Sequence, residues 1–376
     1  MLNPKQRIAV DTIEGPVMVI AGPGSGKTQL LAARIGNILN STDTNAENIL
    51  CLTFTDAAAV EMRDRLKKLI GPTAHKIHIF TFHSFCNNII QEHLSLFGRH
   101  DLEPLSDLER VEIMRRIIDE QPISHPLKRG KTDVYFYEEH LYDLFQRMKA
   151  EDWTVAYVSN KIDEYLADLP QRSEYIYKVT RGSFKKGEPK LAKLADARER
   201  MERLRAAVAL FPRYEEMLTR YRRYDYDDMI LWVLRAFEEN EMLLQSYQER
   251  YLYLLIDEYQ DTNGAQNEII QQLIAYWDDP NIFIVGDDDQ SIFEFQGARL
   301  KNIHEFFDRY RRGMQLVILK ENYRSSQPIL DTARAIIENN RRRIINDLTE
   351  LEVDKDLVAA NAAVAQHPVL PQVVEY

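Results

Sequence analysis

A glycine-rich stretch near the amino terminus has the residue types and spacing of a phosphate-binding turn. Residues 21–28 read AGPGSGKT and lie between an apolar run at 17–20 and a helical pattern at 29–35. Glycines at this spacing let the backbone approach a polyphosphate, whose charge the N–H groups and the helix start would stabilise. Lys27 would reach the β- and γ-phosphates, and the Thr28 hydroxyl would ligate Mg²⁺. We therefore predict a strand, a glycine turn and a helix that bind a nucleoside triphosphate.

The expected turn departs from the usual pattern at its first position. That pattern begins with glycine, whereas this chain has Ala21, a small residue that the turn can tolerate. The alternative is an ordinary glycine turn, but the strand before it and the helix after it favour the phosphate loop. The predicted nucleotide contacts in this stretch are Ala21, Gly22, Pro23, Gly24, Ser25, Gly26, Lys27, Thr28 and Gln29.

A second stretch, LLIDEYQDT at 254–262, ends an apolar run with two acids. Asp257 is placed to hold Mg²⁺, directly or through water, and Glu258 to polarise an attacking water. An acidic surface turn would explain these two residues in isolation. Together with a phosphate loop, however, a strand-end acidic pair indicates a nucleoside triphosphatase.

Further short apolar runs position these motifs. They lie at 49–55, 76–84, 251–258, 281–290 and 315–325, each beside a helical pattern, and they predict a parallel α/β sheet with its site at the carboxyl ends of the strands. The strand signal disappears between about 95 and 215, where long charged helical patterns replace it. We interpret that block as a helical domain inserted into the α/β domain.

The composition sets the broad class. The chain has 376 residues, is 45% hydrophobic and 28% charged, and carries a net charge of −11. That acidity disfavours coating by nucleic acid but permits a local basic groove. No apolar run approaches a membrane span and the amino terminus has no signal-peptide core, so we expect a cytoplasmic protein. Cys51 and Cys86 are too few for a disulfide framework, so both are predicted to be core thiols.

The order and spacing of these motifs resemble the UvrD/Rep-like superfamily 1 DNA helicases over nearly the whole chain. The resemblance implies a RecA-like P-loop fold with an inserted all-helical domain and the start of a second α/β motor domain. It rests on LNPKQRIAV (2–10), AGPGSGKT (21–28), LTFTDAAAVEMRDRL (52–66), TFHSF (81–85), YDYDDMI (224–230), DEYQDT (257–262), VGDDDQSIFEFQGA (285–298) and ENYRSS (321–326).

The resemblance also assigns roles to residues outside the phosphate loop. Gln6 would read the adenine edge, and Tyr323 would stack on the adenine ring. Gln290 would sense the γ-phosphate through its amide, and Arg324 would act as an arginine finger across an interdomain cleft. With Lys27 and Glu258, Gln290 and Arg324 complete the expected catalytic set, and hydrolysis would depend on domain closure.

A track for single-stranded DNA is implied along the same motifs. Aromatic rings would stack on bases while neighbouring polar groups contact the backbone, although core packing is the competing interpretation for each phenylalanine. Asp56 and Ala57 stand where the family has an Asn-Lys pair, and Glu294 and Gln296 replace arginines, so fewer phosphates would be neutralised. A basic loop at 178–193 would compensate or be merely solvated. The expected DNA contacts are Phe54, Thr55, Phe82, His83, Phe293 and Phe295.

Two further family motifs have no counterpart before Tyr376. The chain ends about fifty residues after ENYRSS, fewer than the roughly 100 residues of a complete motor domain. We therefore expect an amino-terminal fragment with motor segments at 1–94 and 215–310, an insertion at 95–214, and the start of a second motor domain at 311–376. A truncated relative without a motor role is the alternative.

By resemblance, the intact protein would be an ATP-dependent DNA helicase that uses Mg²⁺ and moves 3′ to 5′ on single-stranded DNA. Its partners would be single-stranded DNA and single/double-strand junctions, with DNA-repair or replication proteins, and it would act as a monomer away from membranes. Two alternatives stay open: a nucleotide-binding regulatory module without unwinding activity, and the motor part of a helicase-nuclease or of an RNA-directed relative.

Overall fold

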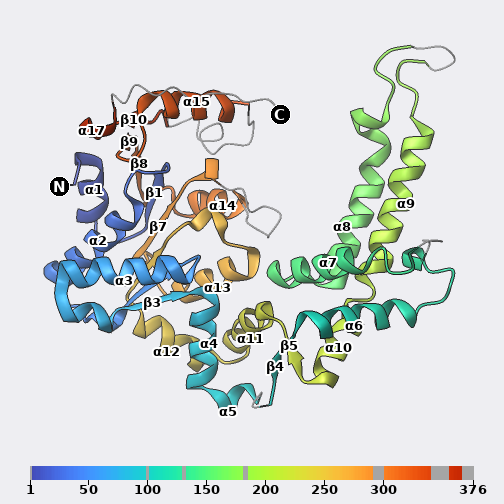
Figure 1. The fold of residues 1–376 in the computed structure, drawn as a ribbon, viewed down its shortest axis with the longest axis horizontal. Coiled ribbons are helices and arrows are strands. Elements are labelled where there is room, and N and C mark those ends of the chain that lie inside the picture. The colour runs from blue at the N-terminus through green and yellow to red at the C-terminus, as the bar shows by residue number, and fades with distance from the viewer. Residues whose placement is uncertain are drawn as a thin grey trace. The chain divides into compact units, whose positions relative to one another are not determined.

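Two compact units make up the chain. The computed structural model describes residues 2–98, 101–128, 133–180, 185–290, 300–339 and 355–365. The first unit comprises Met1–His93 and Trp232–Tyr376, and the second comprises Leu94–Leu231 (Figure 1). The second unit is therefore an insertion in the sequence of the first.

A parallel β-sheet forms the centre of the first unit. Within the described residues it has six strands in the order β3-β2-β6-β7-β1-β8, and each neighbouring pair is parallel. The predicted parallel α/β sheet is thus confirmed. Its strands are β1 (Val17–Ala21), β2 (Ile49–Thr53), β3 (His78–Thr81), β6 (Tyr253–Ile256), β7 (Ile282–Gly286) and β8 (Gln315–Leu319).

The inner strands of this sheet, β2, β6, β7 and β1, are buried on both faces. Alternate residues of β1, Val17, Val19 and Ala21, share one apolar core with α1, α2 and α3, while Met18 and Ile20 are equally buried on the opposite face. A strand covered on both faces needs a continuous apolar run, which is the pattern in the sequence. The helices of this unit are α1 (Pro4–Asp11), α2 (Lys27–Ser41), α3 (Asp56–Ile70), α4 (Phe82–Glu92), α12 (Glu241–Arg250), α13 (Gly264–Ile274), α14 (Leu300–Tyr310) and α15 (Gln327–Ile337).

The sheet extends beyond the expected end of the first motor domain. The sequence interpretation began a second domain at residue 311, but β8 pairs in register with β1, from Val17 opposite Gln315 to Ala21 opposite Leu319. The boundary at 311 is corrected to a position after Leu319, because these residues complete the first sheet. Beyond it, β9 (Glu321–Asn322) pairs in parallel with β10 (Val358–Ala359), and α17 (Ala362–Ala365) follows.

Helices dominate the second unit. Its apolar core includes Phe145 and Tyr214, whose rings stack with centroids 5.2 Å apart. The expected insertion at 95–214 is too short, because Met217 and Leu218 of α10 belong to this core and β5 pairs with β4. Its elements are α5 (Leu94–Phe97), β4 (Glu103–Pro104), α6 (Asp107–Asp119), α7 (Glu138–Ala150), α8 (Val155–Asp168), α9 (Leu191–Val208), α10 (Phe211–Tyr221) and β5 (Arg223–Tyr224), while α11 (Tyr226–Glu239) ends in the first unit.

Two expectations from composition can be compared with these elements. Cys51 and Cys86 are both free and fully buried, and burial raises the pKa of each thiol, so the prediction of core thiols is confirmed. Among the helices in the described ranges, none combines the length and apolarity that crossing a bilayer requires.

A buried ion cluster lies within the second unit. The ammonium of Lys149, only 1% exposed, lies 2.7 Å from a carboxylate oxygen of Asp225 and 2.7 Å from one of Asp228. Tyr214 and Gln146 also donate hydrogen bonds to Asp225, at 3.1 and 3.0 Å. Burial raises the pKa of Asp228 to about 6, although the charge of Lys149 opposes that shift. Within the part of the chain that the structure describes, Lys149 is therefore the cation shared by one buried and one half-buried acid.

We expect Lys149→Met to destabilise folding by about 3–5 kcal/mol near pH 8, the usual loss when one partner of a buried ion pair is removed. Without the cation, nothing of Lys149 opposes the raised pKa of Asp228, so that pKa rises further above the unfolded value. Protonation then favours the folded state, so the loss should shrink as the pH falls to about 5. Urea unfolding monitored by circular dichroism at both pH values measures this.

The matched control is Lys161→Met, because Lys161 forms an exposed ion pair with Glu164 at 2.7 Å. Exposed pairs contribute little, so this variant should unfold close to the parent chain. If Lys149→Met lost no more stability than this control, the buried cluster would not have the assigned role.

Candidate functional site

Four motif segments follow neighbouring strands of the parallel sheet. The strands β6, β7, β1 and β8 are consecutive in the sheet order, so their carboxyl ends lie along one edge. The segments that leave this edge are 257–262 after β6, 287–290 after β7, 22–26 after β1 and 321–324 shortly after β8. Residues separated by as many as 300 positions thereby reach one site.

The glycine-rich turn after β1 has a conformation that requires glycine at two positions. Gly24 has φ +72° and Gly26 has φ +88°, in the left-handed region that favours glycine. Buried Ser25 closes the turn, because its hydroxyl donates to the Gly22 carbonyl at 2.7 Å. Ala21 is the buried last residue of β1, Pro23 and Gln29 are exposed, and Lys27 and Thr28 begin α2. The turn thus leads from strand to helix as predicted.

Lys27 is ion-paired with the strand-end acid. Its Nζ lies 2.6 Å from Oε2 of Glu258, and the two side chains are 10% and 33% exposed. Glu258 has φ +48°, a conformation that costs free energy in a residue with a side chain and is typical of functional sites. The two residues predicted to handle phosphate charge and the attacking water are therefore in direct contact.

Asp257 is the buried acid beside this pair. Its backbone N–H donates to the Leu52 carbonyl at 2.9 Å, and its Oδ1 accepts a hydrogen bond from the Glu258 N–H at 3.0 Å. Burial raises the pKa of Asp257 to about 7, and the like charge of Glu258 adds to the shift. A buried carboxylate whose charged form is disfavoured in this way fits a site that a divalent cation would complete.

A glutamine connects Glu258 with the turn that follows β7. Gln260, 1% exposed, donates through Nε2 to Oε2 of Glu258 at 2.9 Å and accepts through Oε1 from the Asp287 N–H at 2.9 Å. Gly286 makes room for this contact, since a Cβ there would lie 2.5 Å from the Gln260 oxygen. The amide of Gln290 in turn donates to Oδ2 of Asp287 at 2.6 Å. One chain of hydrogen bonds therefore links Lys27, Glu258, Gln260, Asp287 and Gln290.

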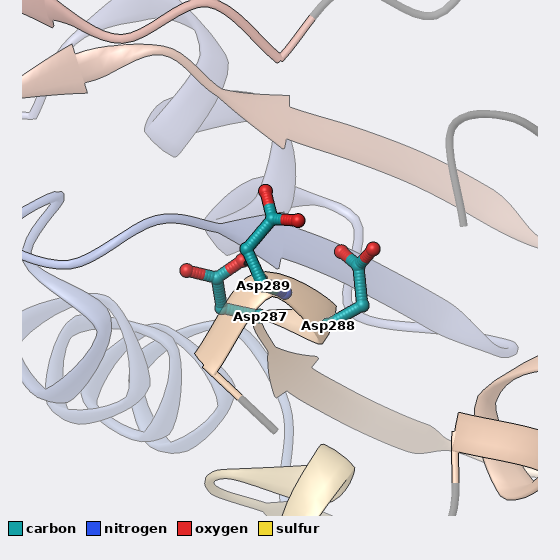
Figure 2. A group of neighbouring side chains, drawn as sticks. All are labelled: Asp287, Asp288 and Asp289. Atoms are coloured by element: carbon teal, nitrogen blue, oxygen red, sulfur yellow. Dashed lines mark hydrogen bonds between the residues drawn. The ribbon is translucent and has the colours of Figure 1, made fainter. Parts of the chain in front are cut away.

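Three consecutive acids form that turn, and their side chains project from it as Figure 2 shows. Asp287, Asp288 and Asp289 each place a carboxylate oxygen within 4.8 Å of the others, a grouping that could hold a metal ion. The ammonium of Lys355 fills the position between them. It contacts Asp287, lies 2.6 Å from Asp288 and lies 2.9 Å from Asp289.

The residues expected to bind adenine lie beside the glycine turn. Buried Gln6 donates through Nε2 to the Ser25 carbonyl at 2.9 Å and forms a capping box with Asn3 at the start of α1. The Asn3 amide donates to the Tyr323 hydroxyl at 3.0 Å, and the Tyr323 N–H donates to the Gly24 carbonyl at 2.9 Å. The structure thus brings Gln6 and Tyr323 into contact with the same turn.

Asn322 ties the segment after β8 to the same turn. Its amide donates to the Pro23 carbonyl, and its Oδ1 accepts from the N–H groups of Arg324 and Ser325 at 2.9 and 2.7 Å. Arg324 itself is exposed, and its Cβ would lie 2.7 Å from a Cβ added at Gly24. Glycine is therefore required at position 24 for space as well as for conformation.

The residues expected to contact DNA divide into three groups. Phe82 is 3% exposed, so its ring belongs to the packed interior and the expectation that a base stacks on it is not supported. Phe54 and His83 are half-buried, and exposed Thr55 caps α3 by accepting from the Ala58 N–H at 3.1 Å. Phe293 and Phe295 lie outside the described residues.

Gln260, Asp287, Asn322 and Lys355 are among the residues of this network that had no assigned role in the sequence interpretation. Gln260 and Asp287 lie within quoted motifs, and the cost of three acids after an apolar strand was a signal that a cation must be near. Asn322 is likewise inside a motif. Lys355 had no local signal, because its partners lie more than 60 positions earlier in the chain.

Comparisons with known proteins agree with this arrangement. The chain is 31% identical over 349 residues to the ATP-dependent DNA helicase PcrA of Staphylococcus aureus (strain Mu50) and 30% identical over 343 residues to that of Bacillus subtilis (strain 168). Each alignment covers 91% of this chain and 40% of the relative, so the chain spans about two fifths of the length of these relatives. The family described as UvrD/REP helicase N-terminal domain matches residues 2–311. The chain therefore belongs to the UvrD/REP helicase N-terminal domain family.

Proposed function

We propose that this chain supplies the ATP-binding motor part of an ATP-dependent DNA helicase. In the whole protein, cycles of ATP binding and hydrolysis would move it along single-stranded DNA, in the 3′ to 5′ direction, and unwind the duplex at a single/double-strand junction. We further propose that it works as a monomer in the cytoplasm with DNA-repair or replication proteins. The relatives named above as ATP-dependent DNA helicases support the general activity.

One observation carries the nucleotide part of this proposal. The ammonium of Lys27, which begins α2 after the glycine turn, lies 2.6 Å from the carboxylate of Glu258, which follows β6. The site therefore holds a cation suited to phosphate next to a carboxylate suited to accept a proton from water. Ordinary surface turns give no reason for this pairing across the ends of β1 and β6, which have β7 between them.

A bound triphosphate would compete with Glu258 for Lys27. Phosphate oxygens would take the Lys27 ammonium, while Glu258 would keep the hydrogen bond from Gln260 that fixes its Oε2. The freed carboxylate could then accept a proton from the water that attacks the γ-phosphate. Gln290 would donate to the γ-phosphate, and Arg324 would stabilise the charge of the transition state.

The residues present fit a magnesium ion at Thr28 and Asp257. Thr28 offers a hydroxyl in the first turn of α2, and Asp257 offers a buried carboxylate with a raised pKa. When bound, Mg²⁺ would neutralise phosphate charge. The adenine would lie against Gln6 and Tyr323.

We expect Lys27→Ala to weaken binding of a fluorescent ATP analogue by about 100-fold or more, since charge-assisted hydrogen bonds to phosphate are lost. Glu258→Gln should bind the analogue about as well as the parent, because it removes the proton acceptor and leaves the phosphate contacts. In a chain that contains a complete second motor domain, the same Glu258→Gln change should abolish hydrolysis. Fluorescence titration and phosphate release measure the two effects.

Lys76→Ala is the matched control, because Lys76 forms an exposed ion pair with Glu47. It should bind the analogue like the parent chain. Equal loss of binding in Lys27→Ala and Glu258→Gln would contradict the division of roles between the two residues.

We expect residues 1–376 to bind Mg²⁺-ATP with negligible DNA-stimulated hydrolysis, and the same chain extended by a complete second motor domain to hydrolyse and unwind. Arginine fingers contribute on the order of 10³ to 10⁵ in rate, and they need a domain that can close on the nucleotide. Phosphate release with and without an oligonucleotide compares the two chains. Robust DNA-stimulated turnover by residues 1–376 would instead show that this sequence completes the site, and turnover stimulated by RNA would favour an RNA-directed protein.

The DNA track can be tested with two phenylalanines. Phe295→Ala should weaken single-strand binding by roughly 1–3 kcal/mol without changing its salt dependence, because stacking neutralises no phosphate. Phe82→Ala should instead lower stability by about 3–5 kcal/mol, as expected for a buried ring. Fluorescence anisotropy at several salt concentrations and urea unfolding measure both variants. A Phe295→Ala variant that loses stability but binds DNA normally would assign that ring to the core.

A further inference from the structure

Lys355 is a buried cation with an unusual number of acidic partners. Its side chain is 3% exposed, and its ammonium contacts carboxylates of Asp287, Asp288 and Asp289, which are 1%, 1% and 16% exposed. These acids raise the pKa of Lys355 despite its burial. Three adjacent carboxylates, two of them buried and one half-buried, would repel one another strongly without a cation. The conformation of the turn in Figure 2 therefore depends on Lys355.

The position of Lys355 depends on the 355–360 segment, which pairs with β9. Two residues after Lys355, Leu357 packs against Gly22, where an added Cβ would lie 2.9 Å from the methyl groups of Leu357. The Val358 N–H donates to the Lys320 carbonyl at 2.9 Å, and the Ala360 N–H donates to the Asn322 carbonyl at 2.7 Å. Pairing of β10 with β9 therefore delivers the ammonium to the acids.

Asp287 is the acid through which this cation reaches the nucleotide site. One oxygen, Oδ1, contacts Lys355, while the other, Oδ2, accepts from the Gln290 amide at 2.6 Å. The Asp287 N–H holds Gln260, which donates to Glu258. Asp287 is thus shared between the docked segment and the two side chains expected to face the γ-phosphate and the attacking water.

We propose that Lys355 is a positioning residue that makes recognition of the γ-phosphate depend on docking of the 355–360 segment against β9. This inference rests on the proposed function, because it assigns Gln290 and Glu258 to the nucleotide. With the segment docked, Lys355 fixes Asp287, and Asp287 fixes the Gln290 amide and Gln260. With the segment undocked, Asp287 loses its cation and the Gln290 amide loses its orientation. The start of the second motor domain thereby reports its position to the γ-phosphate site.

The test compares two nucleotides on the chain of residues 1–376. The quantity measured is the ratio of the dissociation constants of ADP and of a non-hydrolysable ATP analogue, both fluorescent and with Mg²⁺. We expect Lys355→Met to lower this preference for ATP about tenfold, the order of one charge-assisted hydrogen bond, with ADP affinity nearly unchanged. Lys355→Arg should recover part of the preference because it restores a cation.

Two further variants separate positioning from stability. Lys301→Ala is the control, since Lys301 forms an exposed ion pair with Glu305 at 2.7 Å and should leave the ratio unchanged. Lys355→Met combined with Asp288→Asn relieves the repulsion and should regain stability in urea unfolding, yet its preference for ATP should stay low because Asp287 still lacks its cation.

The outcomes distinguish a positioning role of Lys355 from a purely structural ion pair. A ratio in Lys355→Met equal to that of the parent, or a ratio restored together with stability in the double variant, would reduce Lys355 to a structural ion pair and overturn the inference. If the parent chain bound neither nucleotide, the proposed function itself would fail, which is a different result from binding without sensitivity to Lys355.

Discussion

The ion pair between Lys27 and Glu258 is the interaction on which the arrangement of the site depends. The two charged atoms lie 2.6 Å apart although the residues are 231 positions apart in the sequence. Only the order of the parallel sheet makes this possible, because β6, β7 and β1 are neighbours and their carboxyl ends share an edge. Under the proposed function, a phosphate that takes the Lys27 ammonium would release Glu258, so binding of substrate would free the carboxylate.

Buried charged side chains in this protein are stabilised by different kinds of partner. Arg34 is 1% exposed, and its guanidinium donates to the Ala9 and Ile13 carbonyls at 2.7 and 3.0 Å, although burial lowers its pKa to about 10. Lys149 and Lys355 are each surrounded by carboxylates. Asp257 differs, because burial and the neighbouring Glu258 both raise its pKa. Asp257, whose pKa is raised although Lys27 lies nearby, is the proposed ligand of Mg²⁺.

The location of much of this site could be predicted from short stretches of sequence. Its polar motif residues come directly after buried strands, and buried strands are recognisable as apolar runs. The run 17–20 before the glycines, and the run before Asp257, specified both the parallel sheet and the edge at which the motifs meet. The end of the sheet could not be predicted, since the strand Gln315–Leu319 looks like the start of a second domain until its pairing with β1 is seen.

The burial and the partners of the remaining residues depend on tertiary packing, so local sequence patterns could not predict them. The neighbouring sequence does not reveal whether a ring such as Phe82 is exposed or buried; in the structure it is 3% exposed. The partner of three adjacent aspartates could be any cation in the chain, and Lys355 is selected only by the pairing of β10 with β9. Hydrogen bonds such as the one from Gln260 to Glu258 depend on side-chain rotamers that local sequence patterns leave open.

A crystal structure of this chain with Mg²⁺ and a non-hydrolysable ATP analogue tests most directly whether phosphate displaces Glu258 from Lys27. We expect the Lys27 ammonium to move from Glu258 to the β- and γ-phosphates, while Gln260 continues to donate to Glu258. A structure in which the nucleotide is bound and the Lys27–Glu258 ion pair persists would contradict this expectation.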